Sequence, residues 1–223
     1  MCAHVVMVPQ MIIEEIVKEI ERQNLARVMA DWPAVVQPPP EPSALLSQQP
    51  DPTYLKHAFP GSEVPIIVPD AEARLAAQVM TWGYDVSWSK QPVFNTRFDT
   101  ATKPGRNIWA ESLAERRCVV PTYGFYEPHK SETFINPKSN KVNKQQYFFT
   151  SPTSAVLFIA GVFEGDQFSL MTTEPNTTMF PIHSRMPVVL EPNELDTWLF
   201  GEYLSLEDRS RVDLVVTKHQ RTE

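Results

Sequence analysis

The spacing of hydrophobic and polar positions predicts one long helix near the start of the chain. Residues 10–31 carry apolar side chains at helical intervals, interleaved with charged ones. This spacing places the apolar side chains on one face of an α-helix and the charged side chains on the other. A second helix is predicted at 107–115, and a capping signal predicts the start of a third over 191–199.

Most of the remaining chain is typical of β-strands separated by turns. Apolar runs rich in β-branched and aromatic residues, bounded by Pro, Gly and Asn, indicate strands. Residues 131–146 are polar and Lys-rich, and they predict an exposed hairpin or loop. The predicted extended segments are 5–8, 63–69, 75–84, 93–100, 117–127, 147–150, 155–163, 168–173 and 212–216.

These elements predict an α+β fold for residues 1–223 as a single domain, with a largely antiparallel, barrel-like sheet and flanking helices. Seven prolines fall between Pro33 and Pro52. Because proline is incompatible with the interior of regular helices and sheets, 33–52 is predicted to be an extended surface segment. It either covers the domain or recruits a partner, and we favour the covering loop.

Charge and cysteine content narrow the class of protein. The net charge of −7 argues against a protein that binds nucleic acid over its whole surface, although a local basic cleft is compatible with it. Two cysteines, Cys2 and Cys118, are fewer than a disulfide-stabilised secreted chain of this size usually has. The sequence shows no signal peptide and no apolar run that would span a bilayer. We therefore expect a cytoplasmic protein.

Cys2 is the first candidate for chemistry. If Met1 is removed, Cys2 carries a free α-amine and a thiol on one residue. The amine can condense with an aldehyde to an imine, and the thiol can then close a thiazolidine ring. The alternative is a small buried cysteine in a strand, which is also the simplest interpretation of Cys118.

Glu127 is the second candidate, because it follows the aromatic stretch Gly124-Phe125-Tyr126 at the end of a predicted strand. A carboxylate beside aromatic rings is poorly solvated, so its pKa rises towards the range useful for proton transfer. The alternative is that the strand simply delivers Glu127 to solvent.

Five further residues carry weaker signals. Asn95 and Arg97 are two apart in an extended segment, so they lie on the same side and suit a sugar hydroxyl and a phosphate. Trp82 and Trp88 belong either to the core or to a platform for stacking bases. His183 lies in a polar loop between strands, where functional residues are common.

No Gly-rich phosphate loop or metal-ligand spacing is apparent, so we expect no cofactor and no metal. The other histidines are scattered along the chain and carry no usable signal. They are His4, His57, His129 and His219.

Together these motifs resemble the SOS response-associated peptidase (SRAP) family, whose members shield abasic sites in single-stranded DNA by covalent attachment. The resemblance spans nearly the whole chain in the family's order. The matching segments are Met1-Cys2, Trp82-Gly83-Tyr84 with Trp88, Asn95-Thr96-Arg97, Arg117 to Pro121 with Gly124 to Glu127, and Ile182 to Pro187.

The resemblance implies that four side chains converge in one cleft. Cys2 would be the nucleophile, Glu127 would move protons, His183 would act at the deoxyribose ring oxygen, and Asn95 would hold Cys2 and the sugar. It also implies binding to single-stranded DNA that contains abasic sites. We further expect a monomer without a membrane or metal partner. The DNA-binding residues would be Arg97, Arg185, Trp88 and Pro60.

The chain departs from the family pattern on the DNA side. The usual start is Met-Cys-Gly-Arg, whereas this chain has Ala3-His4, and a later Arg-Tyr-Asn-x-Ala-Pro segment survives only as 56–60. We hypothesise that the covalent chemistry persists while DNA affinity or substrate choice is altered. Two alternatives stay open: a thiol (auto)peptidase that uses Cys2 with His183, and a non-catalytic binding module.

Overall fold

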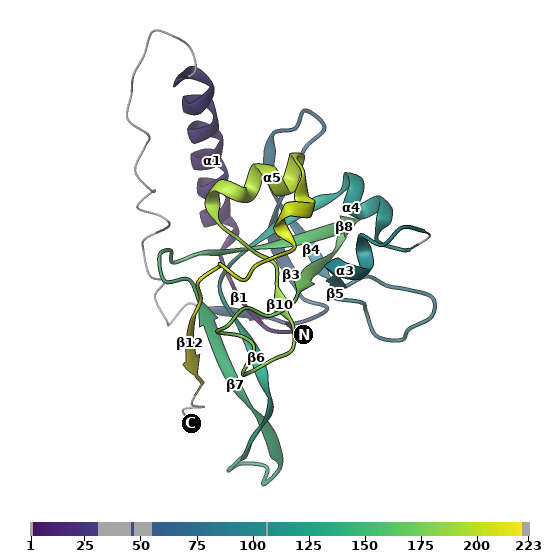
Figure 1. Cartoon of the computed structure of the whole chain (residues 1–223), viewed down its shortest axis with the longest axis vertical. Coiled ribbons are helices and arrows are strands. Elements are labelled where there is room, and N and C mark those ends of the chain that lie inside the picture. Colours follow the sequence, from purple (N-terminus) through teal and green to yellow (C-terminus); the bar gives the residue numbers. More distant parts are fainter. Residues whose placement is uncertain (1, 31–45, 47–54, 106, 220–223) are drawn as a thin grey trace.

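A long helix and a protruding hairpin extend in opposite directions from a central sheet in the computed structural model (Figure 1). The structure describes residues 2–30, 46, 55–105 and 107–219, so the prediction for 33–52 lies, apart from Leu46, outside the described residues. In chain order the elements are β1 (Val5–Met7), α1 (Gln10–Ala30), β2 (Lys56–Ala58), β3 (Glu63–Pro69), β4 (Leu75–Trp82), β5 (Asn95–Arg97), α3 (Phe98–Ala101), α4 (Ala110–Glu115), β6 (Arg117–Ile135), β7 (Val142–Thr150), β8 (Leu157–Glu164), β9 (Gln167–Thr173), β10 (Met186–Pro187), β11 (Val189–Leu190), the 3-10 turn η2 (Pro192–Glu194), α5 (Leu195–Phe200), η3 (Tyr203–Leu206) and β12 (Val215–Lys218).

The strands of the described residues join in one twelve-stranded sheet. Its main path runs β11-β8-β9-β4-β3-β6-β1-β2, with β7 pairing with β6 and β12, and with β5 and β10 pairing with β9. All pairings are antiparallel except β4 with β9 and β5 with β9. The α+β fold with a largely antiparallel sheet is therefore confirmed, and the two parallel pairings are an addition that the sequence did not predict.

A hydrophobic cluster of buried side chains packs on each face of the sheet. Along β6, Cys118 packs in one hydrophobic cluster and the next residue, Val119, packs in the other, as expected when side chains alternate across a strand. The buried residue Ile13 of α1 belongs to the cluster of Val119. Cys2 lies in the opposite cluster, so α1 and Cys2 contribute to different faces of the sheet.

The predicted helices are present with small shifts. α1 matches its predicted range, α4 begins at Ala110, and α5 follows a 3-10 turn in which Glu191 and Glu194 form a capping box. The predicted strand 212–216 is wrong in position, because pairing with β7 sets β12 at Val215–Lys218. In the part of the chain that the structure describes, no helix has the length and apolar character needed to cross a membrane.

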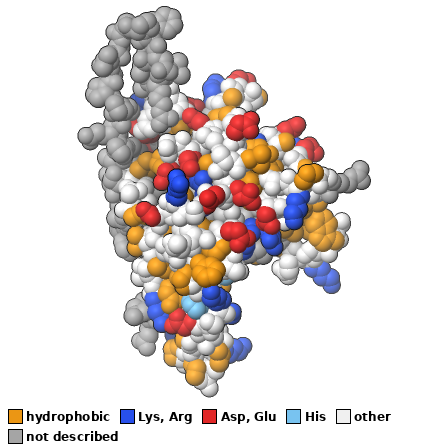
Figure 2. Space-filling model, in the orientation of Figure 1, with side chains coloured by type: hydrophobic (Ala, Val, Ile, Leu, Met, Phe, Trp, Pro, Cys, Tyr) orange, Lys and Arg blue, Asp and Glu red, His pale blue; other side chains and the backbone are white. Residues whose placement is uncertain are grey.

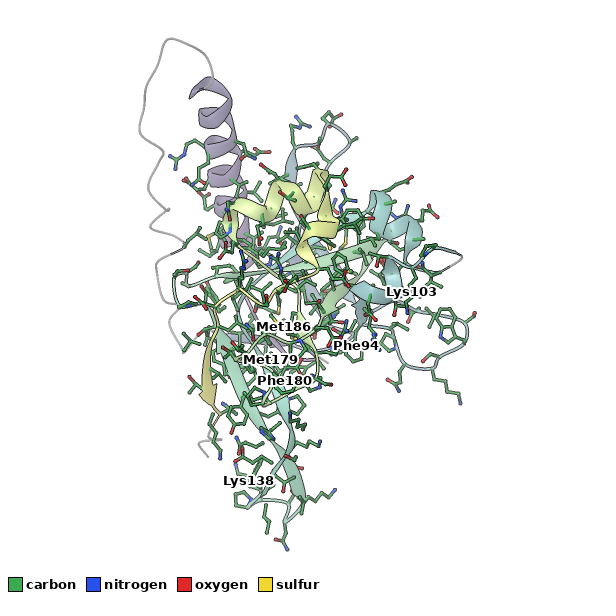
Figure 3. All side chains as sticks on the ribbon, in the orientation of Figure 1. Phe94, Lys103, Lys138, Met179, Phe180 and Met186 are labelled. Atoms are coloured by element: carbon green, nitrogen blue, oxygen red, sulfur yellow. The ribbon has the colours of Figure 1, made fainter. Side chains whose placement is uncertain are left out.

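The hairpin formed by β6 and β7 confirms the prediction for 131–146. β6 is 19 residues long and pairs with β7 as far as Ile135 and Val142, well beyond the core. Lys138 lies at the tip, far from the buried side chains of Met179 and Met186 (Figure 3). Basic and hydrophobic side chains share the surface of this arm (Figure 2). The base of the arm is the segment that carries Glu127.

Candidate functional site

β1 and β6 bring the amino-terminal residues to Glu127. Val5 pairs with Phe125 across the two antiparallel strands, and the backbone N–H of Tyr126 donates to the carbonyl of His4 at 2.9 Å. Glu127 is the next residue on β6 and its side chain is fully buried. The pairing register therefore places Cys2, two residues before His4, beside the middle of β6, where the Glu127 carboxyl group lies.

Asn95 holds the backbone of Cys2. It lies on β5, which pairs with β9 so that Asn95 is opposite Leu170. Its side-chain Nδ2 donates to the carbonyl oxygen of Cys2 at 2.7 Å, in a buried setting. Its Oδ1 is also buried and accepts no hydrogen bond from the described residues, which leaves one acceptor at the site for a substrate or for the Cys2 α-amine.

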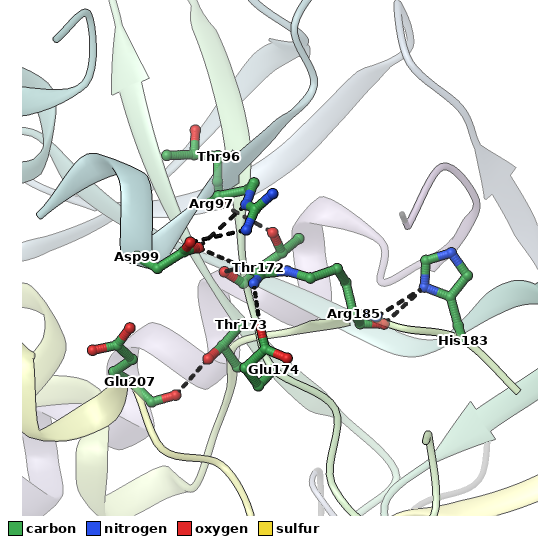
Figure 4. A network of polar contacts seen from close by, with 9 residues as sticks. All are labelled: Thr96, Arg97, Asp99, Thr172, Thr173, Glu174, His183, Arg185 and Glu207. Carbon is green, nitrogen blue, oxygen red and sulfur yellow. Dashed lines mark hydrogen bonds and ion pairs between the residues drawn. The ribbon is translucent and has the colours of Figure 1, made fainter. Parts of the chain in front are cut away.

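His183 reaches the same carboxyl group from a loop. The backbone N–H of Lys130, on β6, donates to the carbonyl of Ile182 at 2.7 Å and so attaches this loop to the strand of Glu127. His183 Nε2 lies 4.0 Å from Glu127 Oε2. Its other ring nitrogen, Nδ1, lies 3.0 Å from the carbonyl oxygen and 3.2 Å from the backbone nitrogen of Arg185 (Figure 4). These contacts orient Nε2 towards the carboxyl group.

Burial sets the protonation states of the site. It raises the pKa of the Glu127 carboxyl to about 7, so at neutral pH this group exists in both its acid and its base form. Burial lowers the pKa of His183, which favours the neutral imidazole. Burial also raises the pKa of the Cys2 thiol well above its usual value, and the charge of Glu127 raises it further. The site therefore combines a protonated thiol with a carboxyl group suited to giving and taking a proton near pH 7.

The four predicted catalytic side chains thus lie together. Cys2 is joined to Asn95 by a hydrogen bond and to Glu127 by electrostatic interaction, and Glu127 faces His183. Their catalytic roles remain predictions. Among the described residues, no cluster of three or more His, Cys, Asp or Glu side chains is arranged to hold a metal ion.

The two predicted phosphate-binding arginines converge on Asp99 (Figure 4). Arg97 is half exposed and bonds both carboxylate oxygens of Asp99, at 3.2 and 2.9 Å. Arg185 is largely buried and bonds Asp99 at 3.1 Å and Glu174 at 2.8 Å. Both guanidinium groups therefore already have carboxylate partners, and their contact with DNA phosphate remains a prediction. Asp99 was not singled out from the sequence, although it lies only two residues after Arg97.

The other predicted DNA-binding residues lie at the surface. Trp88 is 64% exposed in the loop between β4 and β5, whereas Trp82 is fully buried and donates its indole N–H to the carbonyl of Phe94. Trp82 therefore belongs to the core, whereas the ring of Trp88 is exposed and available for stacking. Pro60 is partly buried in the turn after β2, next to Phe59, and its contact with DNA remains a prediction.

Three histidines that carried no signal in the sequence gather around Tyr126. His4 stacks on the Tyr126 ring with centroids 4.3 Å apart, and His57 and His219 lie 6.0 and 5.0 Å from the same ring. His4 and His57 also share a hydrogen bond. These residues are far apart in the sequence, but β1 pairs with β2 and places His4 beside His57. Strand pairing between distant segments is not visible in a single sequence.

Comparisons with known proteins agree with this architecture. Residues 1–221 match the model of the family described as SOS response associated peptidase (SRAP). The chain is 26% identical to the abasic site processing protein YMR114C of Saccharomyces cerevisiae over 206 residues, which are 79% of this chain and 52% of that protein. It is 30% identical to the abasic site processing protein HMCES of Xenopus tropicalis over 162 residues, 60% of this chain and 48% of that protein.

The chain spans about half the length of these curated relatives. Among solved structures, a crystal structure of a Bordetella bronchiseptica protein is similar with a TM-score of 0.61 and 20% identity. The similarity covers 98% of this chain and 100% of that chain. The fold is therefore shared along essentially the whole length.

Proposed function

This chain belongs to the SRAP family, as its motifs predict, and we propose that it attaches covalently to abasic sites in single-stranded DNA through Cys2. The observation that supports this most strongly is the buried Glu127 carboxyl beside Cys2, with its pKa raised to about 7. Relatives named abasic site processing proteins support DNA containing this lesion as the substrate.

The reaction begins at the open-chain aldehyde of the abasic deoxyribose. With Met1 removed, the α-amine of Cys2 adds to the aldehyde carbon, forming a C–N bond while the carbonyl oxygen takes up a proton. Loss of this oxygen as water gives an imine. The Cys2 sulfur then adds to the same carbon, and the thiol proton passes to the nitrogen. The balance is one amine, one thiol and one aldehyde converted to one thiazolidine and one water.

The neighbouring side chains move the protons. Glu127 in its base form takes a proton from the ammonium group, and in its acid form it gives a proton to the departing hydroxyl. Neutral His183 exchanges a proton at the sugar ring oxygen, which opens the ring to the aldehyde. Asn95 fixes Cys2 through the 2.7 Å bond to its carbonyl, so the amine and the thiol meet the aldehyde in a set orientation.

The thiol peptidase alternative fits this site less well. A peptidase thiol attacks as the thiolate, and reactive cysteines therefore have lowered pKa values. The pKa of Cys2 is instead raised by burial and by the negative charge of Glu127. An amine that attacks first, followed by a thiol that reacts with an imine already held beside it, does not need a thiolate in the free protein.

Mass spectrometry of the intact protein tests the proposal. The protein is mixed with a single-stranded oligonucleotide that carries one abasic site, and its mass is expected to rise by that of the oligonucleotide minus one water, with the adduct mapping to Cys2. Cys118→Ala is the matched control, because Cys118 is a buried core cysteine and its loss leaves the adduct intact.

Two variants separate the chemistries. Cys2→Ser keeps the amine but lacks the sulfur, so it forms an imine that borohydride traps and no stable thiazolidine. A protein that retains Met1 has no free Cys2 amine and is expected to form no adduct, although thiol proteolysis would survive. A protein without Met1 that binds the abasic oligonucleotide and gives no adduct, even after borohydride, would refute the proposal and favour a binding module.

A further inference from the structure

His4 and His57 form a hydrogen-bonded pair of imidazoles next to Cys2. His4 Nε2 lies 2.7 Å from His57 Nδ1, although the two residues are 53 positions apart in the chain. The distance requires that one nitrogen carries a proton and that the other accepts it. When the pair is neutral, one N–H lies between His4 Nε2 and His57 Nδ1.

Aromatic rings support this pair. The His4 ring stacks on Tyr126 at 4.3 Å and on Phe59 at 4.4 Å between centroids, with interplanar angles of 16° and 27°. His57 is exposed, and Phe59 is 49% exposed. The electron-rich faces of aromatic rings favour a cation placed over them. The stack therefore fixes the orientation of the His4 ring and leaves His57 open to a ligand.

The backbone of His4 connects the pair to the nucleophile. A hydrogen bond from the His4 backbone reaches the Cys2 thiol and acts against the rise of its pKa. On the other strand, Ala58 packs in the same buried cluster as Cys2. Side chains alternate along a strand, so the two residues that flank Ala58 point outward beside this site. These two residues are His57 and Phe59.

When it is protonated, the His4–His57 pair places a positive charge near Cys2. Arg97 and Arg185 are both engaged by Asp99. The chain as a whole carries a net charge of −7. The pair gains one positive charge when it takes up a proton, and its internal hydrogen bond becomes charge-assisted. The titratable groups that surround it are Cys2 before β1, Lys56 on β2, Tyr126 and Glu127 on β6, and His219 after β12.

We propose that the protonated His4–His57 pair binds a phosphodiester group of the DNA strand next to the abasic site. The inference rests on the proposed function for bringing DNA to Cys2. Among the described residues, His57 has only His4 as a hydrogen-bond partner, so its Nε2–H is available to a phosphate oxygen. Because histidine changes charge between pH 5 and 8, DNA binding by this protein is expected to strengthen as the pH falls through that range.

The test measures non-covalent binding alone. Fluorescence anisotropy follows a single-stranded oligonucleotide containing a tetrahydrofuran abasic analogue, which has no aldehyde, at pH 6 and pH 8 and constant ionic strength. All proteins carry Glu127→Gln, so that this carboxyl does not titrate. We expect a Kd about tenfold lower at pH 6, since one linked proton changes the binding constant by at most a factor of ten per pH unit.

Substitutions identify the pair as the source of the change. His57→Gln and His4→Gln keep hydrogen-bonding groups but cannot be charged, so each is expected to remove most of the pH response. At pH 6 each is also expected to reduce the slope of log affinity against log salt by about 0.7, the value for one phosphate contact on a single strand. His129→Gln is the matched control outside the pair and keeps the full response. Thermal unfolding confirms that each variant is folded.

Separate outcomes test the inference and the proposed function. A pH response that persists in both His4→Gln and His57→Gln overturns the inference, while adduct formation by the wild type would still support covalent attachment. A response that depends on the pair in a protein that forms no adduct supports the inference and refutes covalent attachment. A response that disappears when a chelator is added overturns the inference, because a metal ion would then bridge the imidazoles.

Discussion

Glu127→Gln should stabilise the protein at alkaline pH, because the buried carboxylate opposes folding when it is charged. The side chain is fully buried, and its pKa rises from 4.5 to about 7 chiefly because burial disfavours the charged form. Glutamine has nearly the same shape and carries no charge at any pH. The variant therefore removes the cost of ionisation and keeps the packing.

The magnitude follows from proton linkage. Between pH 4.5 and 7 the folded state holds a proton at Glu127 that the unfolded state has released, so the free energy of unfolding falls as the pH rises. A pKa difference from 4.5 to about 7 corresponds to about 3 kcal/mol, all of it lost above pH 7. Relative to wild type, Glu127→Gln should therefore gain about 3 kcal/mol between pH 4.5 and pH 8.

Urea denaturation at a series of pH values from 4.5 to 8 measures this difference. Glu132→Gln is the matched control, because the pKa of Glu132 is lowered by its bonds to Lys218 and Tyr147. A group whose pKa is lowered in the folded state stabilises the fold at pH values above its unfolded-state pKa, and this stability is lost as the pH falls below that pKa. The difference in the free energy of unfolding between Glu132→Gln and wild type should therefore stay constant from pH 4.5 to 8. A Glu127→Gln difference that is equally constant would refute the assignment of a raised pKa to Glu127.

Four further predictions follow from other contacts. Asn95→Ala removes the buried bond to the Cys2 carbonyl and should slow adduct formation, measured in single-turnover gels, at least about tenfold; an unchanged rate would exclude a positioning role. Asp99→Asn removes one negative charge beside two guanidinium groups and should tighten single-strand binding up to about fivefold at low salt, as anisotropy would show; weaker binding at unchanged melting temperature would contradict this. Trp88→Ala should weaken the same binding by about 1–3 kcal/mol without changing the melting temperature if the exposed ring stacks on a base; equal affinity would remove that role. Gly124→Ala should destabilise the fold by about 1–3 kcal/mol in calorimetry, because its Cβ would lie 2.6 Å from the Phe149 carbonyl oxygen; wild-type stability would show that the strands can separate.

Much of the site was predictable because its signals are local. The aromatic residues before Glu127 predict poor solvation of the carboxyl, and the structure shows that it is buried with a raised pKa. The polar loop around His183 is also visible as a break between apolar runs. The family resemblance then implied that Cys2 and Asn95 join them, and the structure places all four together.

The sequence by itself determined the elements whose signals lie within a few residues. Helical spacing predicts α1, and a polar stretch between two apolar runs predicts the β6–β7 arm, because both depend on contacts between near neighbours in the chain. Only the tertiary structure decided which strands pair. The parallel pairings of β5 and β4 with β9 and the position of β12 depend on contacts between distant segments.

Those distant contacts also decided the electrostatics of the site. Asn95 reaches Cys2 across 93 residues, and His4 reaches His57 across 53. Arg185 meets Asp99 only because β5 and β10 both pair with β9. A single sequence shows which charges the chain carries, but the sheet register determines which of them neutralise one another and which remain available to a ligand.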